Sequence, residues 1–360
     1  MTRQAKTGDP ANEDRPNPVG GDANTPPPVK LFGLLSGMWQ ARAIYLAAQL
    51  RIADVLAEGP RTTPQLAELT GTQTQPLYRL LRAVARLGVF AELDEGHFAN
   101  TELSQFLRPG VPGSMYAMAM GCADWGWRAW GELEHSVRTG QPAFDKVHGI
   151  PLFEYFAEKD AAAGALFDES MTGFSASVDL PIARAADLTG TRSAVDVGGG
   201  QGRLLDTILA TYPTIERGIL FDQPHVVDRV CAAHNESGAV DDGRLELVAG
   251  DFFAAVPAGV DVYLMKTILH DWDDSRATQI LANCRRAMNP GGRVLAAELV
   301  LDLEHSAPFA YFLDLQMLVN LTGQERTEDE FRTLYAAAGL RVTRIIPTNS
   351  LLSLIEGTPA

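Results

Sequence analysis

A run of glycines directly after a short apolar segment constrains this chain more than any other feature. The segment Ser193–Val197 leads into Asp196-Val197-Gly198-Gly199-Gly200-Gln201-Gly202. Glycines let a backbone approach a ligand closely, and a helix that follows them directs its N-terminus at that ligand. Arg203 stands where the last glycine of the dinucleotide-binding pattern G-x-G-x-x-G would be. The run therefore predicts a strand, a loop and a helix around a nucleotide-like cofactor.

Acidic residues follow the next two apolar segments. Asp222 comes directly after Arg217–Phe221, where its carboxylate can accept hydrogen bonds from a ribose diol. The sequence Gly250-Asp251-Phe252 comes shortly after Leu245–Val248, where an acid and an aromatic ring can bind an adenine amino group and stack on its ring. These residues extend the predicted cofactor site over three strand ends.

Strand and helix patterns alternate from Ser193 onward. This alternation predicts an α/β fold with a doubly wound, mostly parallel sheet and helices on both faces. Two later apolar stretches predict an antiparallel hairpin at one sheet edge. The predicted strands are Ser193–Val197, Arg217–Phe221, Leu245–Val248, Val260–Thr267 and Arg293–Val300, and the predicted hairpin joins Leu340–Pro347 to Leu351–Glu356.

His270 is the candidate catalytic base. It follows the strand Val260–Thr267, and ligands of this fold bind at the C-terminal ends of strands. Glu298 ends the next strand, and Glu325 follows a helix predicted over Phe309–Leu321. Both acids can orient the imidazole and stabilise its charged form.

Asp271 leaves two interpretations open. It adjoins His270 and can share its acid–base chemistry. It also precedes a helix predicted to run to Met288, where it could act as an N-cap together with Asp273 and Asp274. For Asp273 and Asp274, capping is the favoured interpretation.

The region before the glycine run predicts several parts. Residues 1–30 hold six of the 21 prolines, a composition typical of a disordered tail. From residue 31 the apolar spacing is helical, a helix starts at Thr62, and a second helix is predicted over Gln75–Leu87 before a short hairpin. Together these elements predict a winged helix. The predicted divisions are a tail over 1–30, an all-helical and winged-helix dimerisation domain over 31–108, a helical linker and substrate-pocket region over 109–190, and a Rossmann-like catalytic domain over 191–360.

The charge balance argues against nucleic acid and membrane partners. The net charge is −15, which repels both nucleic acid and anionic membranes. A winged helix raises the question of DNA binding, and Arg79, Arg82 and Arg86 share one helix face. Residues 31–105 nevertheless hold six Lys/Arg and seven Asp/Glu, a net charge of −1, whereas DNA-binding modules are usually basic. A DNA-binding regulator that senses a cofactor remains the lesser alternative.

The cysteines and the apolar runs bear on the cell compartment. Cys122, Cys231 and Cys284 form no C-x-x-C pair, so neither a disulfide framework nor a metal site is indicated. The N-terminus lacks an apolar signal segment, and no apolar run reaches the ~20 residues that span a bilayer. We expect a cytoplasmic protein with reduced thiols.

Six ordered motifs resemble a known family. The last 170 residues resemble class I S-adenosylmethionine-dependent methyltransferases. Residues 31–360 resemble the small-molecule O-methyltransferases of plant phenylpropanoid and bacterial antibiotic pathways, whose N-terminal winged helix serves dimerisation. The resemblance thus implies a homodimer. The motifs are Val195–Gly202, Phe221–Pro224, Gly250–Phe253, Lys266–Trp272, Asn289–Gly292 and Gly323–Thr327.

The resemblance also implies roles for single residues. The cofactor would be S-adenosyl-L-methionine, and His270 would be the general base, with Glu298, Glu325 and Asp271 beside it. The implied cofactor-binding residues are Ser175, Gly198, Gly199, Gly200, Asp222, Gly250, Asp251, Phe252, Lys266 and Trp272. The candidate residues of the acceptor pocket are Trp130, Phe174, Phe309, Met317 and Asn320.

The predicted function is methylation of a hydroxyl on an aromatic secondary metabolite, such as an aromatic polyketide. A phenol has a pKa of ~10 and imidazole ~6.5, so full proton transfer before methylation would cost about 5 kcal/mol. Neighbouring carboxylates would raise the basicity of His270 and lower that cost. The alternative within enzymes is a family member that uses the cofactor for hydroxylation or decarboxylation.

Overall fold

The computed structural model describes residues 25–94, 96–237, 243–301 and 308–360, and these divide into two compact units. The first unit is Met1–Ala123 and the second is Asp124–Ala360. Most of the predicted tail lies outside the described residues. Its last part does not: α1 begins at Pro27, because a proline fits the first turn of a helix.

The first unit has the form of a winged helix. Strands β2 and β3 form the predicted hairpin, and β1 pairs with β3. Thr62 caps α4, since its hydroxyl accepts from the Gln65 amide while the Gln65 side chain accepts from the Thr62 amide. Gly71 ends α4 in the left-handed conformation. The elements are α1 (Pro27–Leu35), α2 (Gly37–Gln49), α3 (Ile52–Val55), β1 (Arg61–Thr62), α4 (Thr63–Thr70), α5 (Thr74–Arg86), β2 (Phe90–Asp94), β3 (His97–Asn100), α6 (Glu102–Gln105) and α7 (Tyr116–Gly121).

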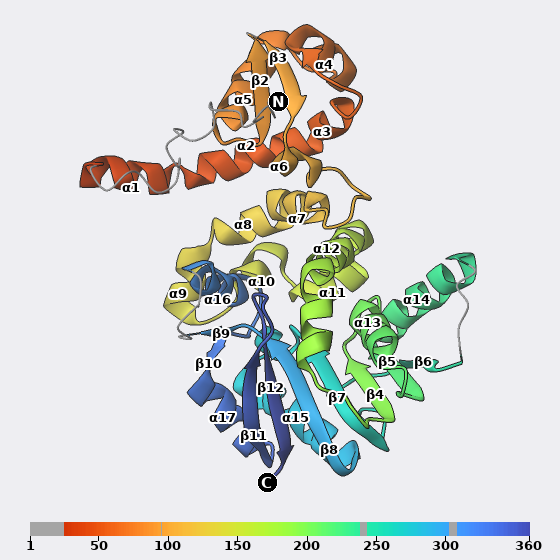
Figure 1. Cartoon of the computed structure of the whole chain (residues 1–360). Helices are drawn as coiled ribbons and strands as arrows, with labels where there is room; N and C mark the ends of the chain where they lie inside the picture. The colour runs from red at the N-terminus through yellow and green to blue at the C-terminus, as the bar shows by residue number, and fades with distance from the viewer. Residues whose placement is uncertain (1–24, 95, 238–242, 302–307) are drawn as a thin grey trace, which may run out of the picture. The chain divides into compact units, whose positions relative to one another are not determined.

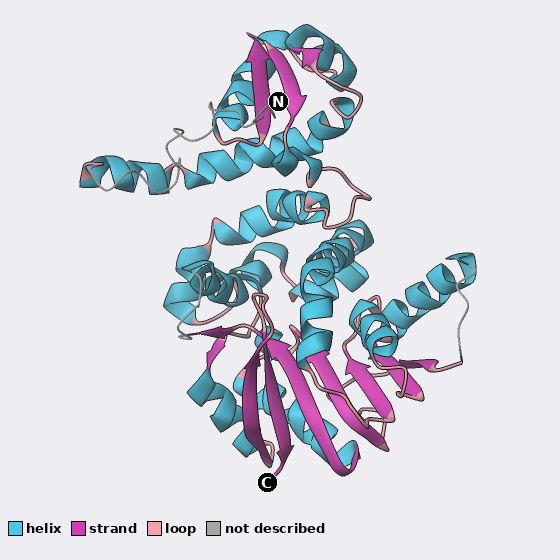
Figure 2. Cartoon of the chain, in the orientation of Figure 1, coloured by secondary structure: helices cyan, strands magenta, loops and turns pink. Residues whose placement is uncertain are grey.

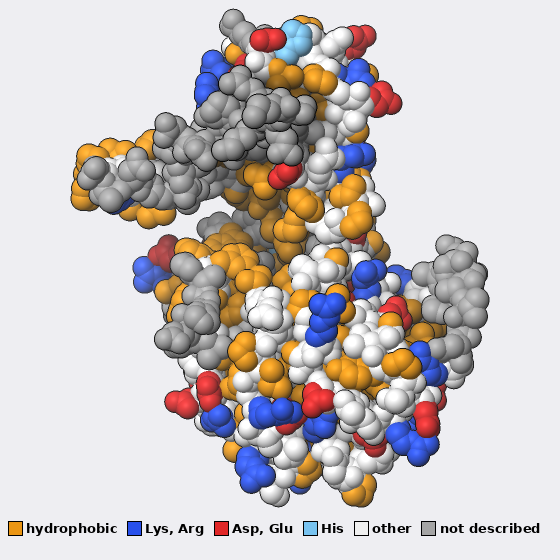
Figure 3. Space-filling view, in the orientation of Figure 1, with side chains coloured by type: hydrophobic (Ala, Val, Ile, Leu, Met, Phe, Trp, Pro, Cys, Tyr) orange, Lys and Arg blue, Asp and Glu red, His pale blue; other side chains and the backbone are white. Residues whose placement is uncertain are grey.

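Within the described part of the chain, helix α1 buries none of its residues. Figure 3 shows hydrophobic side chains along it. More than half of the surface of each of these large apolar side chains of α1 and the start of α2 is exposed: Val29, Leu31, Phe32, Leu34, Leu35, Met38 and Trp39.

The second unit is built on a seven-stranded sheet of order β11-β12-β8-β7-β4-β5-β6 (Figure 1). Strands β8 to β6 in that order are parallel, and β11 and β12 form the predicted antiparallel hairpin. The strands are β4 (Ser193–Val197), β5 (Arg217–Asp222), β6 (Leu245–Ala249), β7 (Val260–Lys266), β8 (Met288–Glu298), β11 (Leu340–Pro347) and β12 (Ser353–Pro359), and a separate parallel pair is β9 (Val300–Leu301) with β10 (Arg326–Thr327).

Strands β8 and β12 differ most from the sequence prediction, whereas the other strands of this sheet agree with it to within one residue at each end. Strand β8 begins at Met288 rather than Arg293, because Met288 already pairs with Val260 and a register shift absorbs the intervening Asn-Pro-Gly-Gly turn. Strand β12 begins at Ser353 and pairs with Glu298 on β8.

Helices cover both faces of the sheet (Figure 2). Side chains of α15 and α17 pack on one face with Val195 and Val197, and side chains of α12 and α13 pack on the other with Ala194. The two cores thus alternate along β4, as a doubly wound sheet requires. The second unit's helices are α8 (Trp127–Trp130), α9 (Leu133–Thr139), α10 (Ala143–His148), α11 (Leu152–Glu158), α12 (Ala161–Ala185), α13 (Arg203–Thr211), α14 (Pro224–Ser237), η2 (Leu269–Asp271), α15 (Asp274–Ala287), α16 (Pro308–Asn320) and α17 (Glu328–Ala337), and the π-helix η1 (Cys122–Gly126) joins the units along the chain.

Helix length bears on membrane insertion. No helix in the described part of the chain is long and apolar enough to cross a membrane.

Candidate active site

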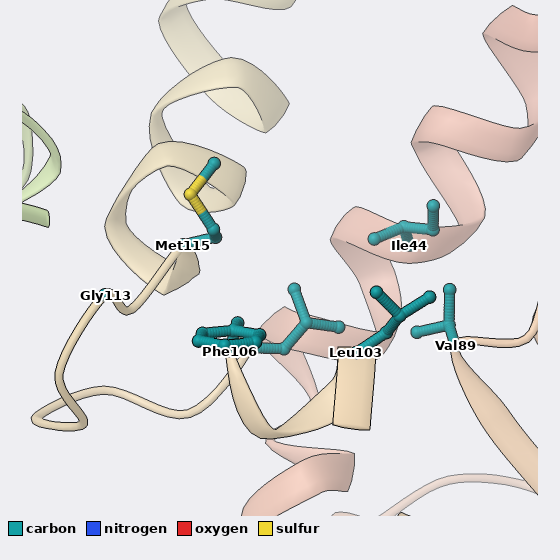
Figure 4. A pocket seen from close by; sticks show the side chains of 7 residues that line it. Ile44, Val89, Leu103, Phe106, Gly113 and Met115 are labelled. Carbon is teal, nitrogen blue, oxygen red and sulfur yellow. The ribbon is translucent and has the colours of Figure 1, made fainter. Parts of the chain in front are cut away.

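The first unit holds a pocket of about 310 Å³ that is lined by apolar residues (Figure 4). No ionisable or other polar side chain lines it. Its lining is Ile44, Val89, Leu103, Phe106, Leu107, Gly113 and Met115. The candidate reactive groups therefore lie in the second unit.

The glycine loop after β4 packs tightly at one point and is open at another. Gly198, Gly200 and Gly202 all have left-handed φ values, of 72°, 57° and 78°. A Cβ added to Gly199 would overlap the Leu220 side chain and lie 2.8 Å from the Asp196 carboxyl carbon. A Cβ added to Gly200 would meet nothing within 4 Å. The loop is thus pressed onto the sheet at Gly199 and leaves free space beside Gly200.

Asp222 lies against this loop at the end of β5. Its Oδ2 accepts the Gly200 amide at 2.8 Å, and its Oδ1 accepts the Gln223 amide at 2.7 Å. Burial raises the pKa of the Asp222 carboxyl, and the two amides partly offset that effect. Each oxygen keeps a second lone pair that can accept a hydroxyl donor.

Asp251 and three aromatic rings lie together after β6 and β7. Asp251 Oδ1 accepts the Phe253 amide at 2.8 Å. The ring of Trp272 meets Phe253 and Phe252 edge-to-face, with centroids 4.7 and 6.0 Å away. Gly250 has no room for a side chain, because an added Cβ would overlap the Phe221 ring. This cluster offers the aromatic surface and carboxylate that an adenine requires.

Lys266 joins the sheet to the long helix α12. Its Nζ donates to Ser175 Oγ and to Asp179 Oδ1, both at 2.6 Å. Ser175 and Lys266 were predicted from the sequence, whereas Asp179 was not. The nearby Asp196 is 1% exposed, and its Oδ2 has no hydrogen-bond partner among the residues that the structure describes. Burial raises the pKa of Asp196 to about 7, although Lys266 opposes the shift.

The imidazole of His270 lies between two carboxylates. Its Nδ1 lies 2.8 Å from Glu325 Oε1, and its Nε2 lies 3.4 Å from Asp271 Oδ1. Burial alone would lower the pKa of His270, but Asp271, Glu325 and the charge of Glu298 outweigh it and raise that pKa to about 10. The Nδ1 contact leaves Nε2 as the nitrogen that can take a proton from a ligand.

Glu298 reaches the site through the backbone. Its Oε1 accepts the amides of Ile268 and Leu269 at 3.0 and 2.8 Å, whereas its contact with the imidazole is electrostatic alone. Burial raises the pKa of this fully buried carboxyl to about 7. Glu298 therefore fixes the turn that carries His270, which differs from the direct orientation expected from the sequence.

The three acidic residues near the start of α15 have different partners. Asp273 is the N-cap, since its Oδ1 accepts the Arg276 amide at 3.0 Å. Asp271 faces His270 instead. Asp274 pairs with Arg326, so its predicted capping role is replaced by an ion pair.

Four of the five candidate acceptor residues lie on α16 or bond to it, and Phe174 lies on α12. Trp130 donates its indole N–H to Gln316 on α16. Met317 and Asn320 are buried on the same helix, and within the described ranges the Asn320 Oδ1 has no hydrogen-bond partner. Phe174 packs against the core. Phe309 is 52% exposed and contributes least to any enclosed surface.

The strand ends fit an adenosyl cofactor. The open space at Gly200, the doubly anchored Asp222, and Asp251 beside its aromatic rings lie at successive strand ends, where the sequence predicts the cofactor. The fold and this site define a class I methyltransferase, which binds S-adenosylmethionine at the C-terminal edge of its sheet.

Comparisons with known proteins place the chain within that class. Residues 130–341 match the O-methyltransferase domain, and residues 32–109 match the O-methyltransferase dimerisation domain. The protein belongs to this O-methyltransferase family and uses S-adenosylmethionine as its cofactor.

Two curated relatives come from antibiotic-producing bacteria. Phenazine O-methyltransferase PhzM of Lysobacter antibioticus is 43% identical over 91% of this chain and 95% of its own length. The mitomycin biosynthesis 6-O-methyltransferase of Streptomyces lavendulae is 41% identical over 87% of this chain and 89% of its own length.

Solved structures share the whole architecture. The LaPhzM crystal structure has a TM-score of 0.86 at 41% identity and covers 93% of this chain and 100% of its own. NcsB1 from neocarzinostatin biosynthesis was solved with S-adenosylmethionine and 2-hydroxy-5-methyl naphthoic acid. It has a TM-score of 0.77 at 33% identity and covers 89% of this chain and 96% of its own.

Proposed function

We propose that this O-methyltransferase methylates a hydroxyl on an aromatic small molecule of secondary metabolism, with His270 as the general base. The observation that carries the proposal is the imidazole held by Glu325 at Nδ1, which leaves Nε2, 3.4 Å from Asp271 Oδ1, as the nitrogen that can take a proton from an acceptor. The phenazine and mitomycin relatives support an aromatic acceptor.

Methyl transfer requires the protein to align the acceptor oxygen and to accept the proton of that oxygen. S-adenosylmethionine, when bound, supplies the activated methyl group. The chain must hold the acceptor oxygen in line and accept its proton. With the pKa of His270 near 10 and that of a phenol also ~10, proton transfer between them is nearly balanced in free energy. The carboxylates thus remove most of the cost calculated for an unperturbed imidazole.

This basicity has a consequence at neutral pH. His270 carries a proton there, so the reactive pair forms only after one proton leaves the site. We therefore propose that turnover of an ordinary phenol rises with pH through the neutral range. Asp271, which lies against Nε2, is the group that first meets the departing proton.

The cofactor roles follow the geometry of the strand ends. The loop residues Gly198, Gly199 and Gly200 would line the methionine part, and Asp222 would hold the ribose. Gly250 to Phe252 with Trp272 would hold the adenine. Lys266 at the end of β7 and Ser175 on α12, which bond to each other, would close the site.

We further propose a cytoplasmic homodimer formed through the first unit. The match of residues 32–109 to a dimerisation domain supports this, as do the unburied apolar side chains of α1. Light scattering at micromolar concentration tests the assembly, and a monomer there would contradict it.

Two measurements test the proposed function. Calorimetry with S-adenosylhomocysteine and with NAD should show binding of the first alone. A panel of phenols, hydroxynaphthoates and hydroxyphenazines, incubated with methyl-labelled cofactor, should yield an O-methylated product. Products that gain oxygen or lose CO₂ without gaining a methyl would favour the hydroxylation or decarboxylation alternative.

A further inference from the structure

We propose that Arg326 is a positioning residue for His270. It holds the turn that carries the histidine by its backbone, so that the imidazole keeps its place between Glu325 and the acceptor. This inference rests on the proposed role of His270 as the base.

The guanidinium of Arg326 bonds to the backbone on both sides of His270 and Asp271. Its Nη1 donates to the Leu269 carbonyl at 2.9 Å, and its Nη2 donates to the Trp272 carbonyl at 2.8 Å. The side chain is fully buried, so water does not compete for these bonds. A planar guanidinium can reach both carbonyls at once, whereas a single ammonium cannot.

Asp274 neutralises the buried charge from the outside. Its Oδ1 accepts from Nε and Nη2 of Arg326 at 3.0 and 2.9 Å. The Asp274 side chain is 71% exposed while that of Arg326 is 0% exposed. The pair therefore fixes the start of α15 to the same guanidinium that holds the histidine turn.

The loop that carries Arg326 lies directly against that turn. A Cβ added to Gly323 would overlap the carbonyl oxygen of His270. Between these residues, Glu325 contacts the imidazole and is itself fixed by Asp314, whose Oδ1 accepts its amide at 3.0 Å. Three residues of the stretch 323–326, Gly323, Glu325 and Arg326, thus set both the backbone and the ring of the base.

Amide hydrogen exchange with mass spectrometry tests this idea without any acceptor. In the full-length R326M variant, peptides covering 268–272 should exchange faster, while peptides of β4 and β5 stay protected. The matched control is R293M, because Arg293 on β8 also donates to a backbone carbonyl, that of Asp187. R293M should leave exchange at 268–272 unchanged. Unchanged exchange at 268–272 in R326M would overturn the proposal, whether or not the proposed function holds.

Kinetics on the acceptor found by the phenol panel give the second readout. Because small misplacements of a catalytic group are costly, R326M should lower kcat by ~10–100-fold, with R326K in between and affinity for S-adenosylhomocysteine retained. Added to H270A, R326M should cause no further loss, since both changes disable one base. A full additional loss, or an equal loss of cofactor affinity, would overturn the positioning role. If R326M does not fold, D274N carries the same test with a smaller expected loss.

Discussion

The glycine loop and the His270 site lie at the same edge of the sheet, yet they are built in opposite ways. The loop is one contiguous run, Asp196–Gly202, that works through backbone amides and absent side chains. The His270 site is assembled from buried charged side chains of the turn 269–272, β8 and the 323–326 loop. The first is therefore sensitive to added volume, and the second is sensitive to changed charge.

The largest effect should come from removing the base. H270A should lower turnover by ~10²–10⁴-fold, the usual effect of a positioned base, and leave S-adenosylhomocysteine affinity nearly intact. The loss should shrink for acceptors with more acidic hydroxyls. Steady-state kinetics and calorimetry measure the two quantities. Near-native turnover on a phenol of ordinary pKa would show that alignment alone drives the reaction.

Paired alanine substitutions in the loop should separate packing from ligand space. In G199A the new methyl overlaps Leu220, so overpacking of about 1–3 kcal/mol should lower the melting temperature. In G200A the methyl enters open space, so the stability loss should be limited to the roughly 1–2 kcal/mol that a left-handed φ of 57° costs an alanine. We also expect weaker S-adenosylhomocysteine binding, by ~10-fold or about 1.4 kcal/mol. Thermal unfolding and calorimetry on both variants provide the test. Native affinity in G200A would remove Gly200 from the cofactor site.

The charge dependence of the base should appear in its pH profile. The pKa of His270 is raised to about 10, with Asp271 as the main charge that raises it. D271N removes that charge, so the rising limb of kcat against pH should move to lower pH by ~1 unit. E298Q, whose carboxylate acts from further away, should shift it less. Histidine NMR can follow the titration directly, and an unmoved profile in D271N would contradict the electrostatic account.

The smallest effect should be one of stability, at Asp196 below the glycine loop. Its pKa is about 7 in the folded protein and about 3.8 in the unfolded chain. A raised acid pKa contributes stability that is complete below pH ~4 and lost as pH rises to ~7. D196N has no such group, so its free energy of unfolding should improve relative to that of the native chain by on the order of 2 kcal/mol between pH 5 and 8, and its melting temperature should rise relative to the native one over that range. A constant difference across that range would show that Asp196 does not titrate there.

Local signals in the sequence predicted the elements well. The strand β4 and both strands of the N-terminal hairpin follow from apolar runs next to turn residues, and Thr62 and Gly71 mark the ends of α4. Asp222 lies at the end of β5, as predicted. Such a position can be predicted because the apolar run of the strand and the acid that follows it are adjacent in the sequence.

Long-range polar pairings could not be predicted in the same way. Lys266 pairs with Asp179, and Arg326 with Asp274, across 87 and 52 residues, and such pairs leave no periodic trace in the sequence. Glu298 lies at the predicted end of β8. That its carboxylate accepts backbone amides rather than contacting the imidazole directly depends on how the chain turns after β7. The role of each site residue in catalysis stays a prediction.

The sheet order has a consequence for how this protein is made. Strand β12 is the last strand of the sheet in the chain, yet it lies between β11 and β8 rather than at the edge. During synthesis β8 and β11 are complete before the strand that separates them exists. A ribosome that stalls before Ser353 would hold a sheet with an open β8 edge, and such an edge invites pairing with another nascent chain.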